Sequence, residues 1–353
     1  MKTSSAKKTL EAAIDEVVAL ARRVVPPKMT AAVLYGSEDL RIEEIEVPSL
    51  APDEVLLRVR LALTDGTDLK VWKRGYHAKM IRPPAVFGHE VVGEVVAVGK
   101  RVDSKWRMGM RVVAANSAPC RTCDPCRRGQ ETLCENLFPL LNGAYAELLL
   151  VPERIAQTNL LPVPPGLAPE VAAMTEPLAC CLHGVEVAGV ERGDTVAIVG
   201  LGPIGLMLAA CVADAGGRPV GVGSREERRA LAPSFGVVPA EPEGADVVIE
   251  AAGTVEAWER SLALVRPGGT VLAFGGLPRD TRVELDPYRI HYEEVRLVGA
   301  FHHTPRHVRA ALAFLATGAY PFERLLTHVV GLEGVAPLFD DPPRDYLKAA
   351  VRP

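Results

Sequence analysis

The stretch Thr195-Val-Ala-Ile-Val-Gly-Leu-Gly-Pro-Ile-Gly205 decides how this chain folds. An apolar run ends in three glycines with the spacing GxGxxG, and an apolar stretch of helical character follows. In this setting the first glycine permits a tight turn, the second admits a pyrophosphate close to the backbone, and the third lets helix and strand pack closely. The N–H groups that open the helix favour an anion. A glycine-rich turn without a ligand is the alternative, but the context favours a dinucleotide, bound at Gly200, Gly202, Pro203, Ile204 and Gly205.

Apolar runs alternate with helical stretches on both sides of this turn. The strand candidates are residues 195–200, 220–223, 246–253, 270–276 and 295–300, and the helical stretches are residues 203–215, 225–235 and 255–265. Such alternation is typical of βαβ units, whose strands form a parallel sheet. The sequence therefore predicts an α/β domain with a doubly wound parallel sheet over residues 176–302.

The flanking regions have a different pattern of apolar and turn-forming residues. From residue 29 to about 160, short β-rich runs are separated by turn signals such as Pro52-Asp53, which predicts a mostly β domain. After residue 302 come one helical stretch and short segments. We expect these to return to the β-rich domain, which then comprises residues 29–175 and 303–353.

Residues 1–28 do not resemble a signal peptide. They begin with a basic stretch but lack an apolar core and a small-residue cleavage site. Apolar residues recur at helical spacing until Pro26-Pro27, which predicts an amphipathic helical extension. The helix could pack on its own domain or contribute to a subunit interface.

Length and composition agree with a two-domain globular chain. The 353 residues carry a net charge of −4, so a basic nucleic-acid surface is not favoured. No apolar run approaches the ~18 residues of a membrane helix. The seven cysteines are an odd number, too sparse for an extracellular disulfide scaffold. We therefore expect a cytoplasmic protein with no nucleic-acid or membrane partner.

The end of the second strand predicts which nicotinamide cofactor binds. An acidic residue about twenty residues after the glycine motif favours NAD, because it binds the ribose diol. Here Gly223 stands at that position, and Ser224, Arg225 and Arg228 follow. A hydroxyl and guanidinium groups suit a 2′-phosphate, so we expect NADP(H). Two glutamates lie close by, which keeps NAD(H) as the alternative.

Four of the seven cysteines fall in one short stretch. Cys120, Cys123, Cys126 and Cys134 have the spacing C-x2-C-x2-C-x7-C. Four thiolates can close a tetrahedral shell around one zinc ion without an open position, which is typical of structural zinc. An iron–sulfur cluster and two disulfides are the alternatives, and a cytoplasmic setting argues against disulfides. We expect a structural zinc lobe at residues 116–138.

Several motifs, in this order, resemble the zinc-dependent medium-chain dehydrogenase/reductase family of alcohol and polyol dehydrogenases. The matching pieces are Asp65-Gly-Thr-Asp68, Gly88-His-Glu90, the four-cysteine stretch, Gly143-Ala-Tyr-Ala-Glu147, Glu176-Pro-Leu178 and the glycine motif. The resemblance implies a GroES-like catalytic domain beside a Rossmann domain. It also implies an alcohol, polyol or sugar as the substrate, and a homodimer or homotetramer.

The resemblance implies a catalytic zinc, with one departure from the family pattern. His89 matches the histidine ligand, and Glu176 matches the third ligand of the polyol and sugar dehydrogenases, direct or through water. The first ligand is usually a cysteine, and this chain has Asp65 there. An aspartate can bind zinc through oxygen, and such a harder donor set tolerates other divalent metals better. The alternative is that the catalytic metal has been lost and Asp65 is a turn residue.

Neighbouring residues also match by position. The resemblance implies that Asp68 holds the second ring nitrogen of His89, that Glu90 lies beside the metal, and that Thr67 takes the substrate's proton. The histidine that often ends this relay is absent, and Lys70 stands there. Lys70 could accept the proton, contact a substrate hydroxyl, or be a solvated lysine.

Three further residues carry expectations. Lys348 lies where the family places a cation that contacts the cofactor's phosphates. His302 and His303 follow the last predicted parallel strand, outside any metal-ligand spacing, near the nicotinamide or at an interface.

The combined motifs predict reversible oxidation of a secondary or polyol alcohol, with hydride transfer to a nicotinamide. Two alternatives stay open. One is a reductase of the same superfamily that has lost its catalytic zinc, and the other is a non-catalytic dinucleotide-binding regulatory protein.

Overall fold

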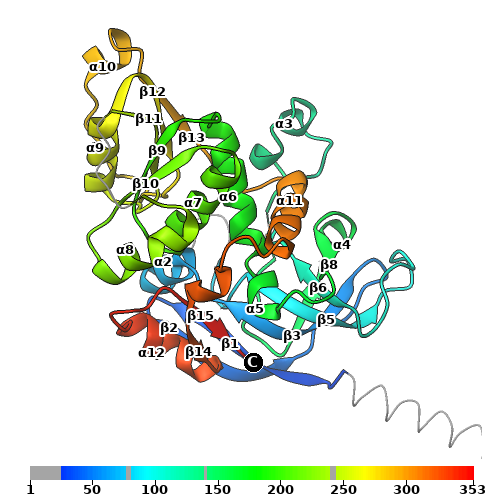
Figure 1. Cartoon of the computed structure of the whole chain (residues 1–353). Coiled ribbons are helices and arrows are strands. Elements are labelled where there is room, and N and C mark those ends of the chain that lie inside the picture. The colour runs from blue at the N-terminus through cyan, green and yellow to red at the C-terminus, as the bar shows by residue number, and fades with distance from the viewer. Residues whose placement is uncertain (1–24, 77–80, 139–140, 239–243) are drawn as a thin grey trace, which may run out of the picture.

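The structure is a computed structural model of the chain, and it describes residues 25–76, 81–138, 141–238 and 244–353. The helix expected over residues 1–28 lies outside the described residues up to residue 24, and Lys28 already begins the first strand. The described chain forms two bodies, each built on a sheet, and the parallel sheet occupies the upper left of Figure 1. Within the described ranges, every helix is too short or too polar to cross a membrane.

The first body is a five-stranded parallel sheet with the predicted βαβ pattern. Its order is β10-β9-β11-β12-β13, and every neighbouring pair is parallel. The strands are β9 (Thr195–Val199), β10 (Arg218–Val222), β11 (Ala245–Glu250), β12 (Val265–Ala273) and β13 (Arg296–Gly299). In β9, Val196 and Ile198 join one hydrophobic cluster, and Ala197 and Val199 join another. Both faces of β9 are therefore buried, which explains why this strand is apolar after Thr195.

Helices lie on both faces of this sheet (Figure 1). They are α6 (Thr175–Ala188), α7 (Pro203–Asp214), α8 (Glu226–Leu231) with a following 3-10 turn (Ala232–Phe235), α9 (Val255–Leu264) and α10 (Pro287–His291). α7 is buried from Gly205 to Val212, as expected for a helix that is apolar all round. The alternation of strands and helices confirms the predicted doubly wound organisation.

The second body is built on a mostly antiparallel sheet. Its order is β14-β15-β3-β5-β6-β8, with β7 beside β3. The strands are β3 (Val55–Leu63), β5 (Glu90–Val98), β6 (Arg111–Ala114), β7 (Leu148–Val151), β8 (Leu160–Pro162), β14 (Leu326–Val330) and β15 (Lys348–Val351). β15 pairs with β3 through Ala350 and Leu63. The strands β14 and β15 thus belong to the β-rich sheet, whereas the helix at residues 305–316 packs on α6.

A small sheet and several short helices complete the described fold. The sheet has the order β2-β1-β4 and consists of β1 (Lys28–Gly36), β2 (Asp39–Glu46) and β4 (Ala85–Val86). The helices are α2 (Gly66–Arg74), α3 (Asp124–Arg127), α4 (Glu153–Thr158), α5 (Pro169–Ala172), α11 (Pro305–Ala316) and α12 (Val335–Asp340), and 3-10 turns cover Glu131–Leu133, Phe322–Leu325 and Leu332–Gly334. α3 lies in a lobe that projects from the rest of the molecule (Figure 1).

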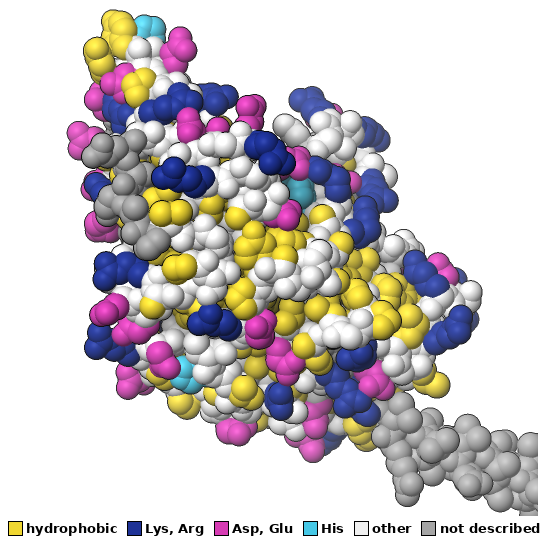
Figure 2. All heavy atoms as spheres, in the orientation of Figure 1, with side chains coloured by type: hydrophobic (Ala, Val, Ile, Leu, Met, Phe, Trp, Pro, Cys, Tyr) yellow, Lys and Arg dark blue, Asp and Glu magenta, His cyan; other side chains and the backbone are white. Residues whose placement is uncertain are grey.

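One hydrophobic cluster joins the two bodies. It contains Leu61 of β3, Val92 of β5, Leu178 of α6 and Ile198 of β9. Because protein interiors are close-packed, a shared core of this kind resists displacement of one body against the other. On the face shown in Figure 2, acidic and basic side chains are interspersed over the described surface.

Candidate active site

Asp65 is the N-cap of α2, two residues after β3 ends at Leu63. Its Oδ1 accepts hydrogen bonds from the backbone N–H groups of Thr67 and, at 3.2 Å, of Asp68. The Asp68 carboxylate accepts in return from the Asp65 N–H, also at 3.2 Å, which completes a capping box. The helix cap therefore uses one carboxylate oxygen of Asp65 and leaves Oδ2 to face His89.

Asp65 and His89 have the spacing of two ligands to one ion. Nε2 of His89 lies 3.6 Å from Oδ2 of Asp65, longer than the roughly 2.7–3.2 Å that is typical of an N–H···O hydrogen bond. Two atoms each about 2.1 Å from a tetrahedral zinc ion lie about 3.4 Å apart. One donor atom each from Asp65, His89 and Glu90 lies within 4.8 Å of the other two. The donor set thus fits zinc and harder divalent metals.

Asp68 contacts the ring nitrogen of His89 that does not face Asp65, and Tyr145 holds Asp68. Nδ1 of His89 lies 3.2 Å from Oδ1 of the buried Asp68. The Tyr145 hydroxyl donates to Oδ2 of Asp68 at 2.6 Å. Such a carboxylate fixes the ring and leaves Nε2 as the ligand atom. Burial would lower the pKa of His89, but Asp68 and Asp65 raise it well above its ordinary value. Burial would raise the pKa of Asp65, but His89 and Lys348 hold it well below its usual range.

Lys348 of β15 forms a buried ion pair with Glu90 of β5. Its Nζ lies 2.8 Å from Oε1 and 2.7 Å from Oε2, and the two side chains are 2% and 0% exposed. Burial would lower the pKa of Lys348, but the carboxylates of Glu90 and Asp65 raise it, so the ammonium stays charged. The expected contact of Lys348 with a cofactor phosphate is replaced here by the contact with Glu90, because β15 inserts between β14 and β3 and buries this side chain.

Glu176, in the first turn of α6, lies in a second group of donors. One donor atom each from Glu176, His302 and His303 lies within 4.8 Å of the other two. Nε2 of His303 is 3.6 Å from Oε1 of Glu176 and 3.2 Å from Oδ1 of Asn116. Burial raises the pKa of Glu176 despite the nearby charge of His89. The sequence placed these histidines outside any metal-ligand spacing, and their only signal was a position after a parallel strand.

Thr67 and Lys70 lie one turn apart on α2. Thr67 is half-buried beside Asp65. Lys70 donates through Nζ to the carbonyl oxygen of Gly276 at 3.1 Å and lies next to Gly253. These glycines follow β12 and β11, at the carboxyl edge of the parallel sheet, where such sheets bind ligands. Lys70 is therefore held against that edge by the Gly276 carbonyl.

The glycine motif has the predicted geometry. Gly200 adopts a φ of 107°, a backbone conformation that residues with a Cβ atom disfavour. A Cβ on Gly205 would overlap the carbonyl oxygen of Gly200, so α7 approaches β9 this closely only with glycine there. Gly202 caps α7 in front of Pro203, and Nη1 of Arg228 lies 3.6 Å from where a Cβ on Gly202 would be.

The residues expected to select the cofactor lie together after β10. Ser224 and Arg225 are exposed, whereas Arg228 is half-buried and donates through Nη2 to the carbonyl oxygen of Tyr346 at 3.3 Å. A Cβ on Gly223 would lie 3.2 Å from a leucine side chain. The position that carries an acid in NAD-binding sites is thus crowded as well as neutral.

The four cysteines of the projecting lobe converge. One sulfur each from Cys120, Cys123, Cys126 and Cys134 lies within 4.8 Å of the others, and Sγ of Cys123 is 3.9 Å from Sγ of Cys134. A disulfide requires about 2.05 Å, whereas two thiolates about 2.3 Å from a tetrahedral zinc ion lie about 3.8 Å apart. Hydrogen bonds, first from the Thr122 side chain, lower the pKa of Cys120 to about 4. All seven cysteines are free thiols, which favours a metal over disulfides.

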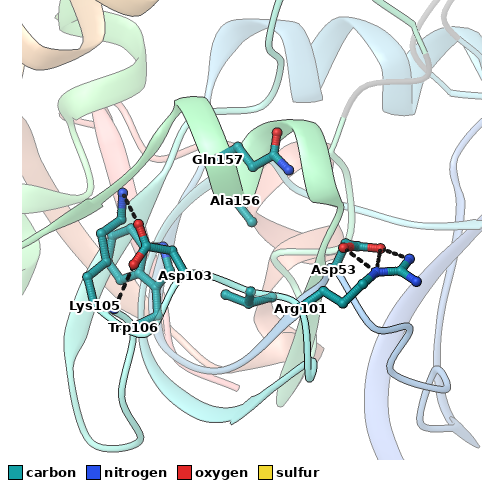
Figure 3. A pocket seen from close by; sticks show the side chains of 8 residues that line it. Asp53, Arg101, Asp103, Lys105, Trp106, Ala156 and Gln157 are labelled. Carbon is teal, nitrogen blue, oxygen red and sulfur yellow. Dashed lines mark hydrogen bonds and ion pairs between the residues drawn. The ribbon is translucent and has the colours of Figure 1, made fainter.

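A small hollow lies at the other end of the β-rich body (Figure 3). Its volume is about 240 Å³, and it is lined by Asp53, Arg101, Val102, Asp103, Lys105, Trp106, Ala156 and Gln157. Two ion pairs, Asp53 with Arg101 and Asp103 with Lys105, neutralise its charges. Asp53 precedes β3 and Arg101 follows β5, whereas the metal donors lie at the opposite ends of these strands. Nine-residue strands at about 3.3 Å per residue separate the two places by about 30 Å.

Comparisons with known proteins agree with this geometry. The family described as alcohol dehydrogenase GroES-like domain matches residues 51–165, and the family described as zinc-binding dehydrogenase matches residues 203–317. D-arabinitol dehydrogenase 1 from Uromyces fabae is 30% identical over 95% of this chain and 100% of its own length. The chain belongs to the zinc-dependent medium-chain dehydrogenase/reductase family.

Two more relatives extend this result. Sorbitol dehydrogenase from Bacillus subtilis strain 168 is 30% identical to this chain. The match covers 88% of this chain and 92% of the sorbitol dehydrogenase. A structure described as a zinc-binding dehydrogenase from Sinorhizobium meliloti 1021 bound to NADP superimposes with a TM-score of 0.84, at 32% identity over 92% of this chain and 99% of that one. The dehydrogenase therefore combines a GroES-like domain with a Rossmann domain, as predicted, and it is an oxidoreductase that acts on CH–OH groups. The family assignment also supports zinc and a nicotinamide cofactor.

Proposed function

We propose that the dehydrogenase reversibly oxidises a secondary hydroxyl group of a polyol or sugar, with a catalytic divalent metal and NADP(H). The observation that carries the proposal is the 3.6 Å separation of His89 Nε2 from Asp65 Oδ2, with Asp68 behind the other ring nitrogen. This separation is close to the roughly 3.4 Å expected for two ligand atoms of one tetrahedral zinc ion. The relatives named for D-arabinitol and sorbitol support a polyol as substrate.

In this proposal Asp65 and His89 hold the metal, and Glu176 is the third ligand, direct or through water. When bound, the metal supplies a Lewis acid for the substrate's hydroxyl oxygen, and the nicotinamide supplies a hydride acceptor. Asp68 keeps His89 in the tautomer that offers Nε2. Glu90 lies beside the metal and pairs with Lys348 within the protein.

Thr67 and Lys70 carry the proton in this proposal. The Thr67 hydroxyl, beside Asp65, accepts the proton of the substrate's hydroxyl and donates its own, because one hydroxyl oxygen can do both. Lys70 lies farther along α2, at the carboxyl edge of the parallel sheet. Its side chain either ends the relay or contacts a substrate hydroxyl.

NADP(H) is proposed over NAD(H) because of the charges that follow β10. Ser224 and Arg225 offer a hydroxyl and a guanidinium at the exposed end of the strand, and Arg228 adds a second cation. Charge-assisted hydrogen bonds of this kind suit a phosphate. The solved relative described as bound to NADP supports this choice.

Metal counting tests the ligand assignment. Asp65→Ala should retain the zinc of the cysteine lobe but lose the second ion and the turnover of D-arabinitol or sorbitol. Asp280→Ala changes an exposed aspartate and is the matched control, which should keep both ions and full activity. An active Asp65→Ala variant that holds two ions would overturn the assignment. A single ion per chain in an active wild-type enzyme would indicate a dehydrogenase without a catalytic metal.

The ratio of kcat/KM with NADP⁺ to kcat/KM with NAD⁺ tests the cofactor. Arg225→Gln should lower the value for NADP⁺ about 10- to 150-fold, the range for one hydrogen bond to a charged group, and leave the value for NAD⁺ unchanged. Arg309→Gln, at an exposed arginine of α11, is the control. A wild-type ratio below one would refute the choice of NADP(H).

Three further expectations are proposals as well. The GroES-like domain comprises residues 29–175 and 303–353, the Rossmann domain residues 176–302, and the enzyme is a cytoplasmic homodimer or homotetramer. Light scattering coupled to size-exclusion chromatography gives the mass of the assembly, and a monomer would refute the last expectation.

A further inference from the structure

The segment that leads into β15 touches both halves of the proposed reaction site. At its centre, the carbonyl oxygen of Tyr346 accepts the hydrogen bond from Arg228 Nη2 at 3.3 Å. The hydroxyl of the same residue lies 2.8 Å from Oγ1 of Thr64. Two residues later, Lys348 pairs with Glu90. One short segment therefore contacts helix α8 on the Rossmann side, and the end of β3 and the start of β5, where the metal donors lie.

Thr64 is the residue directly before Asp65, and it is 0% exposed. Its Oγ1 accepts the N–H of Ala349 at 2.8 Å, and its own N–H donates to the carbonyl oxygen of Ala349 at 3.0 Å. The Tyr346 hydroxyl adds a third contact to this residue. The backbone from which Asp65 leaves β3 is thus held by the segment Tyr346–Ala349.

Arg228 stands on the other side of Tyr346. Its Nη1 lies 3.6 Å from where a Cβ on Gly202 would be, so the guanidinium lies beside the turn that admits the cofactor's pyrophosphate. The hydrogen bond to the Tyr346 carbonyl fixes the direction of this long side chain. Tyr346 is half-buried between the two contacts.

We propose that Tyr346 is a positioning residue that aligns the metal-bound substrate with the cofactor. Its hydroxyl, through Thr64, sets the position of Asp65, and its carbonyl sets the position of Arg228 on the cofactor. Hydride transfer requires the reacting atoms within about 3–3.5 Å of each other, and supporting side chains must hold such geometry to within about 0.5 Å. This inference rests on the proposed function, because it takes Asp65 as a metal ligand.

Tyr346→Phe separates the two contacts, because it removes the hydroxyl and keeps the ring and the carbonyl. Hydride transfer in a single turnover should slow about 2- to 13-fold, the range for one net hydrogen bond. KM for the cofactor should change less than about twofold, since the carbonyl still holds Arg228. With Co²⁺ loaded at the Asp65–His89 site, the visible absorption bands should shift, because Asp65 moves. Tyr288→Phe, at an exposed tyrosine of α10, is the matched control.

A double-mutant cycle tests the path through Thr64. Thr64→Val should slow hydride transfer at least as much as Tyr346→Phe, because it also removes the acceptor of the Ala349 N–H. The double variant should be no slower than Thr64→Val alone, because both single changes remove the hydrogen bond between Tyr346 and Thr64. Thr64→Ser keeps a hydroxyl and should retain the wild-type rate. Arg228→Met should show the opposite split, with a raised KM for the cofactor and unchanged Co²⁺ bands.

The outcomes distinguish this inference from the proposed function. An unchanged rate and an unchanged Co²⁺ spectrum in Tyr346→Phe would overturn the inference, as would additive effects of Thr64→Val and Tyr346→Phe. If the Asp65→Ala variant keeps the Co²⁺ bands of the wild-type site, the ligand assignment is wrong, and the inference that rests on it is wrong as well.

Discussion

Lys348→Met should destabilise the dehydrogenase by leaving a buried carboxylate without its cation. Glu90 is 0% exposed, and the Lys348 Nζ lies 2.7 and 2.8 Å from its two oxygens. Removing one partner of such a pair costs about 3–5 kcal/mol of the free energy of unfolding. Methionine keeps the apolar length of the lysine stem, so the change tests the charge rather than the packing.

The cost should grow with pH in a defined direction. Burial raises the pKa of Glu90 above its ordinary value, and without Lys348 this carboxyl binds a proton in the folded state that the unfolded chain has already released. The stability of the variant then falls as the pH rises from the unfolded pKa to the folded pKa, by about 1.36 kcal/mol per pH unit. A total of about 3–5 kcal/mol therefore corresponds to about two to four pH units. In the wild type, Lys348 stays charged over this range, since its pKa is raised.

Urea unfolding between about pH 5 and pH 8 measures this dependence, followed by the fluorescence of the buried Trp72 and Trp106. The matched control is the double variant Lys348→Met/Glu90→Gln, which removes both charges. It should recover most of the lost stability and show no slope with pH beyond that of the wild type. A loss that is equal at every pH, or a double variant no more stable than Lys348→Met alone, would refute the reasoning.

Three other changes have defined outcomes. Asp68→Asn should weaken metal binding at His89 about 10- to 100-fold, measured by competition with a chelator, and equal affinity would contradict the role of Asp68. Cys123→Ser should release the metal of the lobe, whose donor sulfurs lie within 4.8 Å of one another, and lower Tm, while full metal content would argue against a zinc site there. Gly205→Ala should prevent cofactor binding or folding, because its Cβ would overlap the carbonyl oxygen of Gly200; calorimetry with NADPH measures this, and normal binding would disprove the close approach.

Local patterns in the sequence predicted the parallel sheet well. β9 ends at Val199 and α7 begins at Pro203, as the apolar run and the glycine spacing indicate, because both signals are local. β12 begins earlier than predicted, at Val265. Val265 pairs with Ala245, and regular pairing with β11 resumes at Thr270. The residues between them include Pro267 and two glycines, which disfavour a regular strand, and the register shifts there.

The candidate site was predicted where a motif is compact and missed where it is assembled from distant segments. Asp65, Thr67 and Asp68 occupy one helix turn, so their spacing already indicates a shared face. His303 meets Glu176 only because α6 and the segment after β13 lie together in the fold. The partner of Lys348 is likewise set by the insertion of β15 into the β-rich sheet, which leaves no periodic signal in the sequence.

The insertion of β15 has a consequence for how the protein is made. Glu90 and Lys348 are 258 residues apart. A ribosome that adds about 5–20 residues per second therefore synthesises Lys348 about 13–50 s after Glu90. During that time the strands around Glu90 can pair, but the space that β15 will fill stays open. The GroES-like domain therefore cannot finish folding before the Rossmann domain has been synthesised. A nascent chain stalled before residue 348 should expose this unfinished sheet to proteases, although its parallel sheet is already complete in sequence.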